Sequence, residues 1–150
     1  MNRPALVPEL YVSEYSRSLN YYVDVIGFEV LYDRPEDRFA ALALGAAHLM
    51  IEEAPSLHAA TSAQIQAGEW RPAPLERPFG RGLNFEIRVP NVSVIFERLE
   101  RYSQPVLLAP HNRRYRVGDR SVEYKTLLVP DPDGYLLRFV ELISADFNTE

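Results

Sequence analysis

Two stretches of the chain carry the same alternation of apolar and polar positions, and each is followed by a turn and an amphipathic segment with helical spacing. These stretches are residues 5–12 and residues 83–89, and Glu9 and Glu86 occupy equivalent places in them. A period of two is typical of a strand with one buried side and one more polar side. The chain is therefore predicted to be one βαβββ unit written twice.

The remaining pattern of the first half predicts the other elements of that unit. Apolar positions at helical spacing predict a helix over residues 17–26, with Ser16 as its N-cap and Gly27 as its C-terminal stop. The further predicted elements are a strand over residues 28–32, a polar turn at 33–37, and a hairpin of residues 38–44 and 48–52 around Gly45.

The middle of the chain has a different character, with little periodicity, several prolines and the single tryptophan, Trp70. We assign residues 54–80 to a linker arm that contains a short helix within residues 55–66. The arm separates a first module, residues 5–53, from a second, residues 81–142, within one domain spanning residues 1–150. A connection of this length inside a compact domain often serves as a functional lid.

The second module repeats the first in outline. An apolar stripe predicts a helix over residues 92–102. The turn at residues 131–134 has the sequence DPDG, which favours a tight chain reversal. The further predicted elements are a strand over residues 105–109, a basic loop over 111–120, and strands over 122–129 and 135–142.

Composition narrows the function classes. A chain of 150 residues with 47% hydrophobic residues suits one domain with a substantial core. Its net charge of −5 argues against a nucleic-acid partner, and the absence of cysteine excludes disulfides and thiolate metal ligands. No apolar run is long enough to cross a membrane, and the start of the chain lacks the apolar stretch of a signal peptide, so we expect a cytoplasmic protein with no membrane partner.

Four motifs in order carry a family resemblance. They are SLNYY at residues 18–22, IGF at 26–28, RPFGRG at 77–82 and DPDGYLLRF at 131–139. With them the chain resembles the vicinal oxygen chelate superfamily, and within it the glyoxalase/bleomycin resistance protein group. The resemblance implies an α+β fold in which paired βαβββ modules form curved mixed sheets around a ligand cavity, usually in a homodimer. It also implies that the enzymes of the superfamily hold a divalent metal, whereas the bleomycin resistance proteins sequester their antibiotic without one.

The resemblance places the metal ligands of the enzymes at Val7, Asn84 and Arg138. Valine cannot coordinate a metal, an amide oxygen is a weak ligand for a transition metal, and a guanidinium repels a cation. We therefore expect no metal, no cofactor and no catalytic residues. A relocated metal site remains an alternative, because strand alternation places Glu9 and Glu86 on the same faces as Val7 and Asn84, and Glu52 joins them.

The candidate ligand-binding residues are those predicted to line the cup. Arg88 and Arg138 share faces with the carboxylates and can compensate their charge, while aromatic rings can stack on a planar ligand. His58, His111 and residues 113–116 have a plainer interpretation as solvated surface. The candidates are Glu9, Tyr11, His48, Met50, Glu52, Trp70, Asn84, Glu86, Arg88, Tyr115 and Arg138.

These observations favour a metal-free protein of the bleomycin resistance type, which confers antibiotic resistance by capturing a cationic or aromatic small molecule in a cup at a homodimer. One alternative is a metal-dependent lyase, isomerase, transferase or dioxygenase that uses the relocated carboxylates. Another is a binding or regulatory domain for a metabolite.

Overall fold

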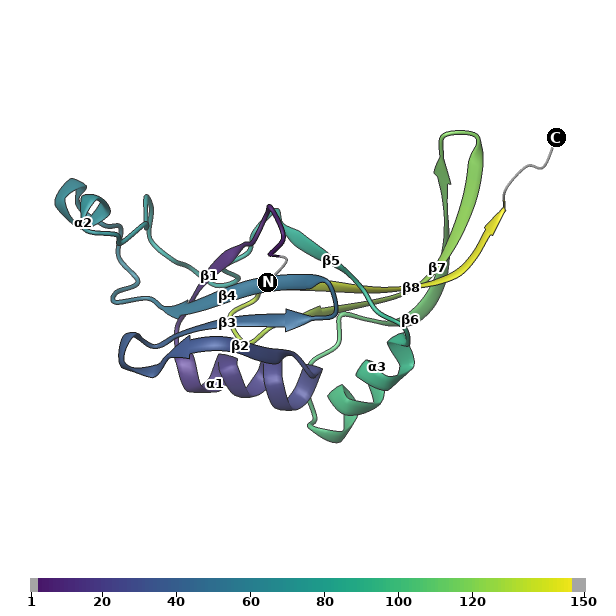
Figure 1. The fold of residues 1–150 in the computed structure, drawn as a ribbon, viewed down its shortest axis with the longest axis horizontal. Coiled ribbons are helices and arrows are strands. Elements are labelled where there is room, and N and C mark those ends of the chain that lie inside the picture. The colour runs from purple at the N-terminus through teal and green to yellow at the C-terminus, as the bar shows by residue number, and fades with distance from the viewer. Residues whose placement is uncertain (1–2, 147–150) are drawn as a thin grey trace.

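The computed structural model describes residues 3–146, which form two four-stranded mixed sheets with helices packed against one side of each (Figure 1). The predicted α+β class is confirmed. The sheets have the strand orders β1-β4-β3-β2 and β5-β8-β7-β6. Among these residues no helix combines the length and the apolar character that crossing a membrane requires.

The elements follow one another in the order expected for a doubled unit. The strands are β1 (Glu9–Val12), β2 (Glu29–Arg34), β3 (Phe39–Leu44), β4 (Ala47–Glu53), β5 (Asn84–Arg88), β6 (Leu108–Val117), β7 (Arg120–Pro130) and β8 (Leu136–Asp146). The helices are α1 (Tyr15–Asn20), the π-helical η1 (Tyr21–Ile26), the 3-10 helix η2 (Pro35–Asp37), α2 (Ser62–Gln66) and α3 (Val92–Arg101).

Both sheets are assembled from the chain in the same way. The first strand of each module pairs in parallel with the last, β1 with β4 and β5 with β8, and the other pairings are antiparallel. Glu9 lies opposite Met50 in the first sheet, and Glu86 lies opposite Arg138 in the second. The predicted repeat is therefore confirmed down to strand register, with Glu9 and Glu86 in equivalent places.

The first predicted helix is present but begins earlier than expected, at Tyr15, and changes from α to π geometry midway. Ser16 was wrongly predicted as the N-cap, because Glu14 holds that position without a side-chain capping bond. The carboxylate of Glu53 takes over the role of a cap by accepting a hydrogen bond from the backbone N–H of Tyr15 at 2.9 Å. Sequence pattern alone missed this cap because it comes from a distant strand.

Gly27 ends the first helix as predicted, with a φ of 106° that favours glycine. A Cβ atom at this position would lie 2.7 Å from the guanidinium of Arg98 on α3. The same guanidinium donates a hydrogen bond to the backbone carbonyl of Asp24 at 2.9 Å. The end of the first helix is thereby attached to the helix of the second module.

A single apolar core connects the two modules. Leu10 and Val12 of β1 and Ile51 of β4 are buried, as are Ile87 of β5 and Phe139 of β8, and all belong to one connected cluster. Burial of apolar surface, worth about 25 cal/mol per Å², is the main stabilising contribution here. Successive side chains along a strand point to opposite sides of the sheet. Each sheet therefore also has a second side, which the helices leave open.

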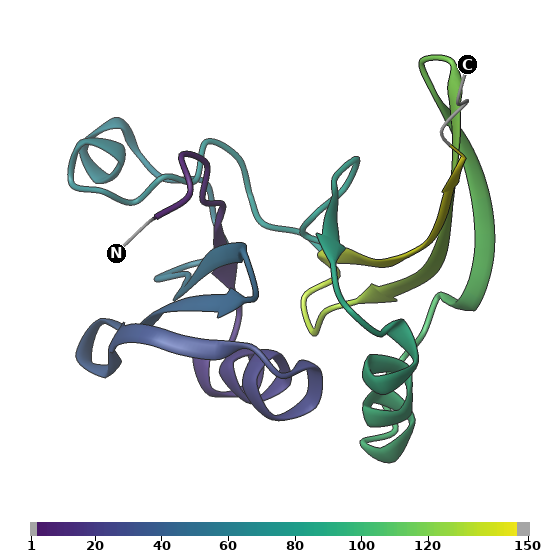
Figure 2. The same cartoon turned by 45° about the vertical axis from the view of Figure 1, so that its right-hand side comes forward.

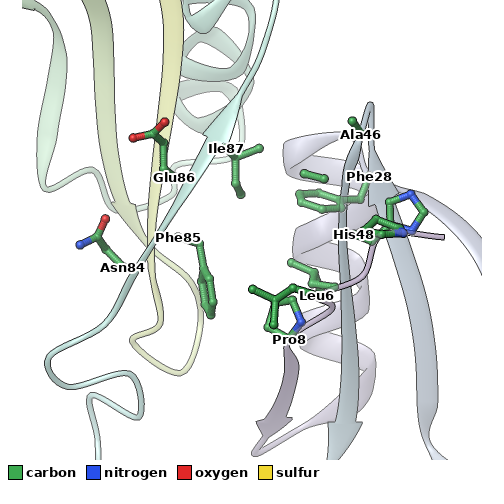
Figure 3. A pocket seen from close by; sticks show the side chains of 12 residues that line it. Leu6, Pro8, Phe28, Ala46, His48, Asn84, Phe85, Glu86 and Ile87 are labelled. Carbon is green, nitrogen blue, oxygen red and sulfur yellow. The ribbon is translucent and has the colours of Figure 1, made fainter. Parts of the chain in front are cut away.

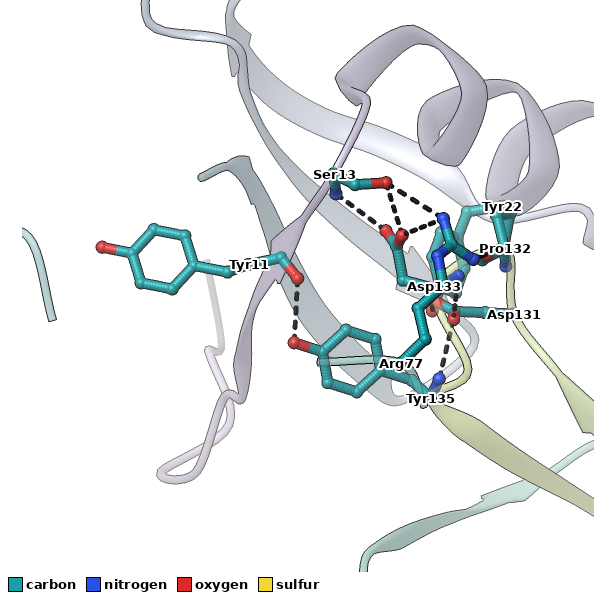
Figure 4. Close-up of polar contacts among 8 residues, drawn as sticks. All are labelled: Tyr11, Ser13, Tyr22, Arg77, Asp131, Pro132, Asp133 and Tyr135. Atoms are coloured by element: carbon teal, nitrogen blue, oxygen red, sulfur yellow. Dashed lines mark hydrogen bonds and ion pairs between the residues drawn. The ribbon is translucent and has the colours of Figure 1, made fainter. Parts of the chain in front are cut away.

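The DPDG turn between β7 and β8 lies between the modules and ties them together (Figure 4). Asp133 is 1% exposed and accepts hydrogen bonds from the backbone N–H of Ser13 at 2.9 Å and from the Ser13 hydroxyl at 2.5 Å. Arg77 of the arm forms an ion pair with the same carboxylate at 3.0 Å. One buried carboxylate therefore holds the end of β1, the arm and the second sheet at one point.

Asp131 adds a second connection at the same turn. Its carboxylate accepts a hydrogen bond from the hydroxyl of Tyr22 in the first helix at 2.7 Å and from the backbone N–H groups of Asp133 and Tyr135. Burial raises the pKa of Asp131 to about 6, although these hydrogen bonds act in the opposite direction. Tyr135 in turn donates its hydroxyl hydrogen to the backbone carbonyl of Tyr11 at 2.8 Å.

The prediction of a basic loop over residues 111–120 was wrong. This segment belongs to a long hairpin of β6 and β7 that projects from the body of the molecule (Figure 1), and the strand predicted over residues 105–109 overlaps β6 only at its start. Arg113, Arg114 and Arg116 are all exposed, because solvent reaches both sides of the projecting hairpin. Such a strand lacks the apolar alternation from which strands are recognised.

Two other predicted elements are shorter than expected. The strand predicted over residues 5–12 begins only at Glu9, since Pro8 has no N–H to donate and contributes only its carbonyl, which accepts from Met50. The helix predicted within residues 55–66 is confined to α2, which begins after Thr61, whose hydroxyl accepts from the backbone N–H of Gln64 in a capping box.

Replacement of Asp133 by Ala tests the importance of the junction. It would leave the partly buried N–H of Ser13 without its acceptor and remove the carboxylate that pairs with Arg77, so we expect the free energy of unfolding to fall by about 2–4 kcal/mol. Urea unfolding followed by circular dichroism measures the change. The exposed helix residue Glu97 provides a control as Glu97→Ala, and a similarly small loss in both variants would contradict the assigned role.

Candidate functional site

The open side of the first sheet carries five of the predicted site residues. Glu9 and Tyr11 of β1 lie there, and β4 contributes His48, Met50 and Glu52. Tyr11 is opposite Glu52 in the parallel pair, just as Glu9 is opposite Met50. Side chains two apart on a strand share a side, so the structure brings these residues together on one surface, which we call the first face.

Two carboxylates at the centre of the first face interact with each other. The pKa of Glu52 is raised from 4.5 to about 7, first by burial, then by its hydrogen bond with Glu9 and by the negative charge of Glu9. Arg34 acts in the opposite direction. It has its own partners, because its guanidinium lies 4.0 Å from the ring centroid of Phe39 and 3.1 Å from Asp37. Glu52 therefore retains a proton close to neutral pH, beside the carboxylate of Glu9.

The arm lies against Tyr11. The backbone N–H of Trp70 donates to the Tyr11 hydroxyl at 3.0 Å, while the indole itself is 64% exposed. The next residue, Arg71, is 1% exposed and lies with its guanidinium 5.9 Å from the Tyr11 ring centroid. Arg71 donates to the carbonyl of His58 at 3.0 Å and pairs with Glu69 at 3.0 Å. Trp70 is thus held beside the first face with its ring available.

Sequence reasoning missed Arg71. Its Nη1 atom is buried and has no hydrogen-bond partner within residues 3–146. No pattern around it signals burial, because the arm has no periodicity and a charged residue is ordinarily exposed. Arg71 organises the fold of the arm by linking the segments on either side of α2.

The open side of the second sheet, the second face, carries the remaining strand candidates. Arg138 of β8 donates to the amide oxygen of Asn84 at 3.0 Å and pairs with Glu86 of β5 at 3.0 Å. Arg88 lies 3.8 Å from the other oxygen of Glu86. The ion pairing suggested by strand alternation is thus present for Glu86, whereas Glu9 interacts with Glu52 instead. Tyr115 lies farther along, in the projecting hairpin.

The residues at the positions that the resemblance assigns to metal ligands do not fit a divalent cation. Val7 offers only an apolar side chain, and the amide oxygen of Asn84 already accepts a hydrogen bond from Arg138. The positive charge of Arg138 opposes a second cation beside it. No group of three or more His, Cys, Asp or Glu side chains within residues 3–146 is arranged to hold a metal ion.

The first and second faces point away from each other in one chain. Between the modules lies an apolar cavity of about 330 Å³, into which Leu6, Phe85 and Ile87 point (Figure 3). The polar ends of Asn84 and Glu86 point away from this cavity on the opposite side of the second sheet (Figure 3). One chain therefore does not bring all of the predicted site residues around one cup, and the turned view shows the diverging sheets (Figure 2).

The other two histidines contribute little to either face. His58 is exposed on the arm, and its contacts are made by its backbone. The Nδ1 atom of His111 lies 2.9 Å from the backbone carbonyl of Ala109. His48 is the histidine that belongs to the first face, as strand alternation predicted.

No protein-family model and no curated protein matches the chain. Among solved structures, the chain is 31% identical to a glyoxalase/bleomycin resistance protein/dioxygenase superfamily member from Vibrio splendidus 12B01, over 91% of this chain and 97% of that one, with a TM-score of 0.39.

More distant sequences have a similar fold. TioX from Micromonospora sp. ML1 is 18% identical, with 93% of this chain and 100% of that chain covered and a TM-score of 0.64. Lactoylglutathione lyase from Agrobacterium tumefaciens is 20% identical, with 91% and 92% covered and a TM-score of 0.57. These likenesses concern the fold, since they extend over nearly the whole of each chain at low identity.

Glu52→Gln tests the carboxylate pair. Since the folded-state pKa of Glu52 is raised to about 7, its contribution to stability is complete below its ordinary pKa and is lost as the pH rises through about 7. We expect the free energy of unfolding to fall more between about pH 5 and about pH 8 in the wild type than in Glu52→Gln. Urea unfolding at both pH values measures this, with the exposed Glu36→Gln as control. Equal changes in wild type and Glu52→Gln would contradict the pairing.

Proposed function

The chain belongs to the glyoxalase/bleomycin resistance protein/dioxygenase superfamily, and from this premise we propose that it is a metal-free small-molecule binding protein of the bleomycin resistance type. In this proposal it sequesters a cationic or aromatic ligand in a cup at a homodimer. Protection of the cell from an antibiotic follows from stoichiometric capture rather than turnover.

The observation that carries the metal-free assignment is the contact between Arg138 and Asn84. A guanidinium stands where the enzymes of the superfamily have a carboxylate ligand, and it is held there by two oxygen acceptors, one from Asn84 and one from Glu86. A bound divalent metal would have to displace this cation or lie beside it, and either arrangement is electrostatically unfavourable. The Arg138 position thus supports binding without a metal.

The first face has the chemistry for capturing a cation. Glu52 lies within hydrogen-bonding reach of Glu9, and neither forms an ion pair within residues 3–146, so a positively charged ligand can replace the proton on Glu52. The neighbouring ring of Tyr11 and the exposed indole of Trp70 provide flat apolar surface. Aromatic faces also attract cations directly, which favours a ligand with charge on or near a ring system.

The directions of the two faces support a cup formed by a pair of chains. Each face is an open side of a curved sheet, and a single chain presents them away from each other. A ligand on the first face alone would remain largely exposed, whereas small-molecule sites in proteins usually bury most of their ligand. A second copy supplies the missing wall if its second face covers the first face of its partner.

A metal-loading experiment tests the assignment against an enzyme with relocated carboxylates. After incubation with manganese, iron, nickel or zinc and desalting, we expect less than about 0.1 equivalent of metal per chain, because Val7 and Arg138 leave too few ligands. Elemental analysis measures the content. Near-stoichiometric metal in the wild type that is absent from Glu9→Gln/Glu52→Gln would contradict the proposal and favour the enzyme.

Ligand capture is tested by the same double variant. In a thermal-shift screen of cationic aromatic compounds, we expect those that stabilise the wild type to bind Glu9→Gln/Glu52→Gln at least about tenfold more weakly, because the carboxylates that attract the cation have been neutralised. Glu97→Gln/Glu100→Gln removes two exposed carboxylates of α3 and so matches the change in charge away from the site. Unchanged affinity for every cationic compound would rule out the capture role.

A further inference from the structure

Equivalent positions of the two modules carry different charges. The shared register relates Glu9 to Glu86 and Met50 to Arg138. Two residues beyond each glutamate, Tyr11 in the first module corresponds to Arg88 in the second. The second face thus has two guanidinium groups at positions where the first face has an aromatic ring and a thioether.

Two residues farther along the last strand of each module, the first face carries the charged residue and the second face the uncharged one. Glu52, which lies opposite Tyr11, corresponds to Val140, which lies opposite Arg88. The first face therefore has a second carboxylate where the second face has an apolar side chain. Arg34, the cation of β2 that influences Glu52, is engaged by Asp37 and Phe39. Arg3 also reaches this face, with its guanidinium 3.6 Å from the Sδ atom of Met50. Neither Glu9 nor Glu52 forms an ion pair within residues 3–146, so the two carboxyl groups remain open to a cation.

The second face has a surplus of positive charge. Arg88 and Arg138 share the single carboxylate of Glu86, at 3.8 Å and 3.0 Å. The Arg88 side chain is 78% exposed, so its guanidinium is open to a second acceptor. Arg113 lies on the same side of the sheet. It is opposite Tyr124, which is two residues from Thr126, and Thr126 is opposite Val140, the partner of Arg88. An oxyanion approaching this face would meet planar donors suited to bidentate contacts.

We propose that the ligand is a zwitterion, with its cationic group held by Glu9 and Glu52 of one chain and a carboxylate held by Arg88 and Arg138 of the other. This inference rests on the proposed function, because it requires both faces to line one cup. It assigns a separate role to each module: the first recognises the positive end of the ligand and the second the negative end. A ligand with both charges compensates the carboxylates of the first face and the guanidinium groups of the second. A simple cation compensates only the carboxylates.

A matched pair of dyes tests this inference. Rhodamine B carries a xanthene cation and a carboxylate, and rhodamine B ethyl ester has the same cation without the carboxylate. We expect the wild-type homodimer to bind rhodamine B at least about tenfold more tightly than the ester, as measured by fluorescence anisotropy at about pH 8. Arg88→Gln and Arg138→Gln should each reduce this ratio towards one while leaving the affinity for the ester within about twofold.

Controls separate the possible failures. Arg101→Gln at the exposed end of α3 matches the change in charge and should keep the wild-type ratio. Glu9→Gln/Glu52→Gln should weaken binding of both dyes by a similar factor. Equal binding of the two dyes by the wild type would contradict the zwitterion inference alone. Binding of neither dye would contradict the proposed function itself. Far-ultraviolet circular dichroism confirms that each variant is folded.

Discussion

The buried hydrogen bonds of the DPDG turn fix how the two modules sit relative to each other. Asp133 accepts from both donors of Ser13 and from Arg77, so the end of β1 and the arm are attached to the start of β8 at one point. Buried carboxylates with matched donors have few alternative arrangements, because every displaced donor would be left unsatisfied. The turn and the apolar core beside it therefore set the direction in which each sheet presents its open face.

That direction determines where a ligand can bind. The helix-covered sides of the sheets approach each other across an apolar cavity of about 330 Å³, and the polar faces point outward. Neither face encloses a ligand, although each has functional groups at its centre. Equivalent positions of the two modules carry different side chains, so the first face is acidic and aromatic and the second face is basic. The proposed pairing of two chains follows from this outward direction of the two faces.

Strand alternation was sufficient to place Glu9, Tyr11, His48, Met50 and Glu52 on one face, because these strands have one buried side. It failed for the β6–β7 hairpin, where Arg113 and Arg114 point to opposite sides and both meet solvent. Arg71 was missed because burial of a charge in an irregular arm leaves no periodic trace. The relative direction of the two faces was also beyond sequence reasoning, since it depends on contacts between residues more than a hundred positions apart, such as Ser13 with Asp133.

Cross-linking of mixed chains tests most directly whether the cup is shared between copies. The natural chain has no cysteine, so Met50→Cys in one tagged chain and Leu136→Cys in another introduce single thiols on the first and second faces. If the cup is shared, we expect a short bis-maleimide to join the two differently tagged chains. Cross-linking within a Met50→Cys/Leu136→Cys double variant, with none between the mixed chains, would contradict it.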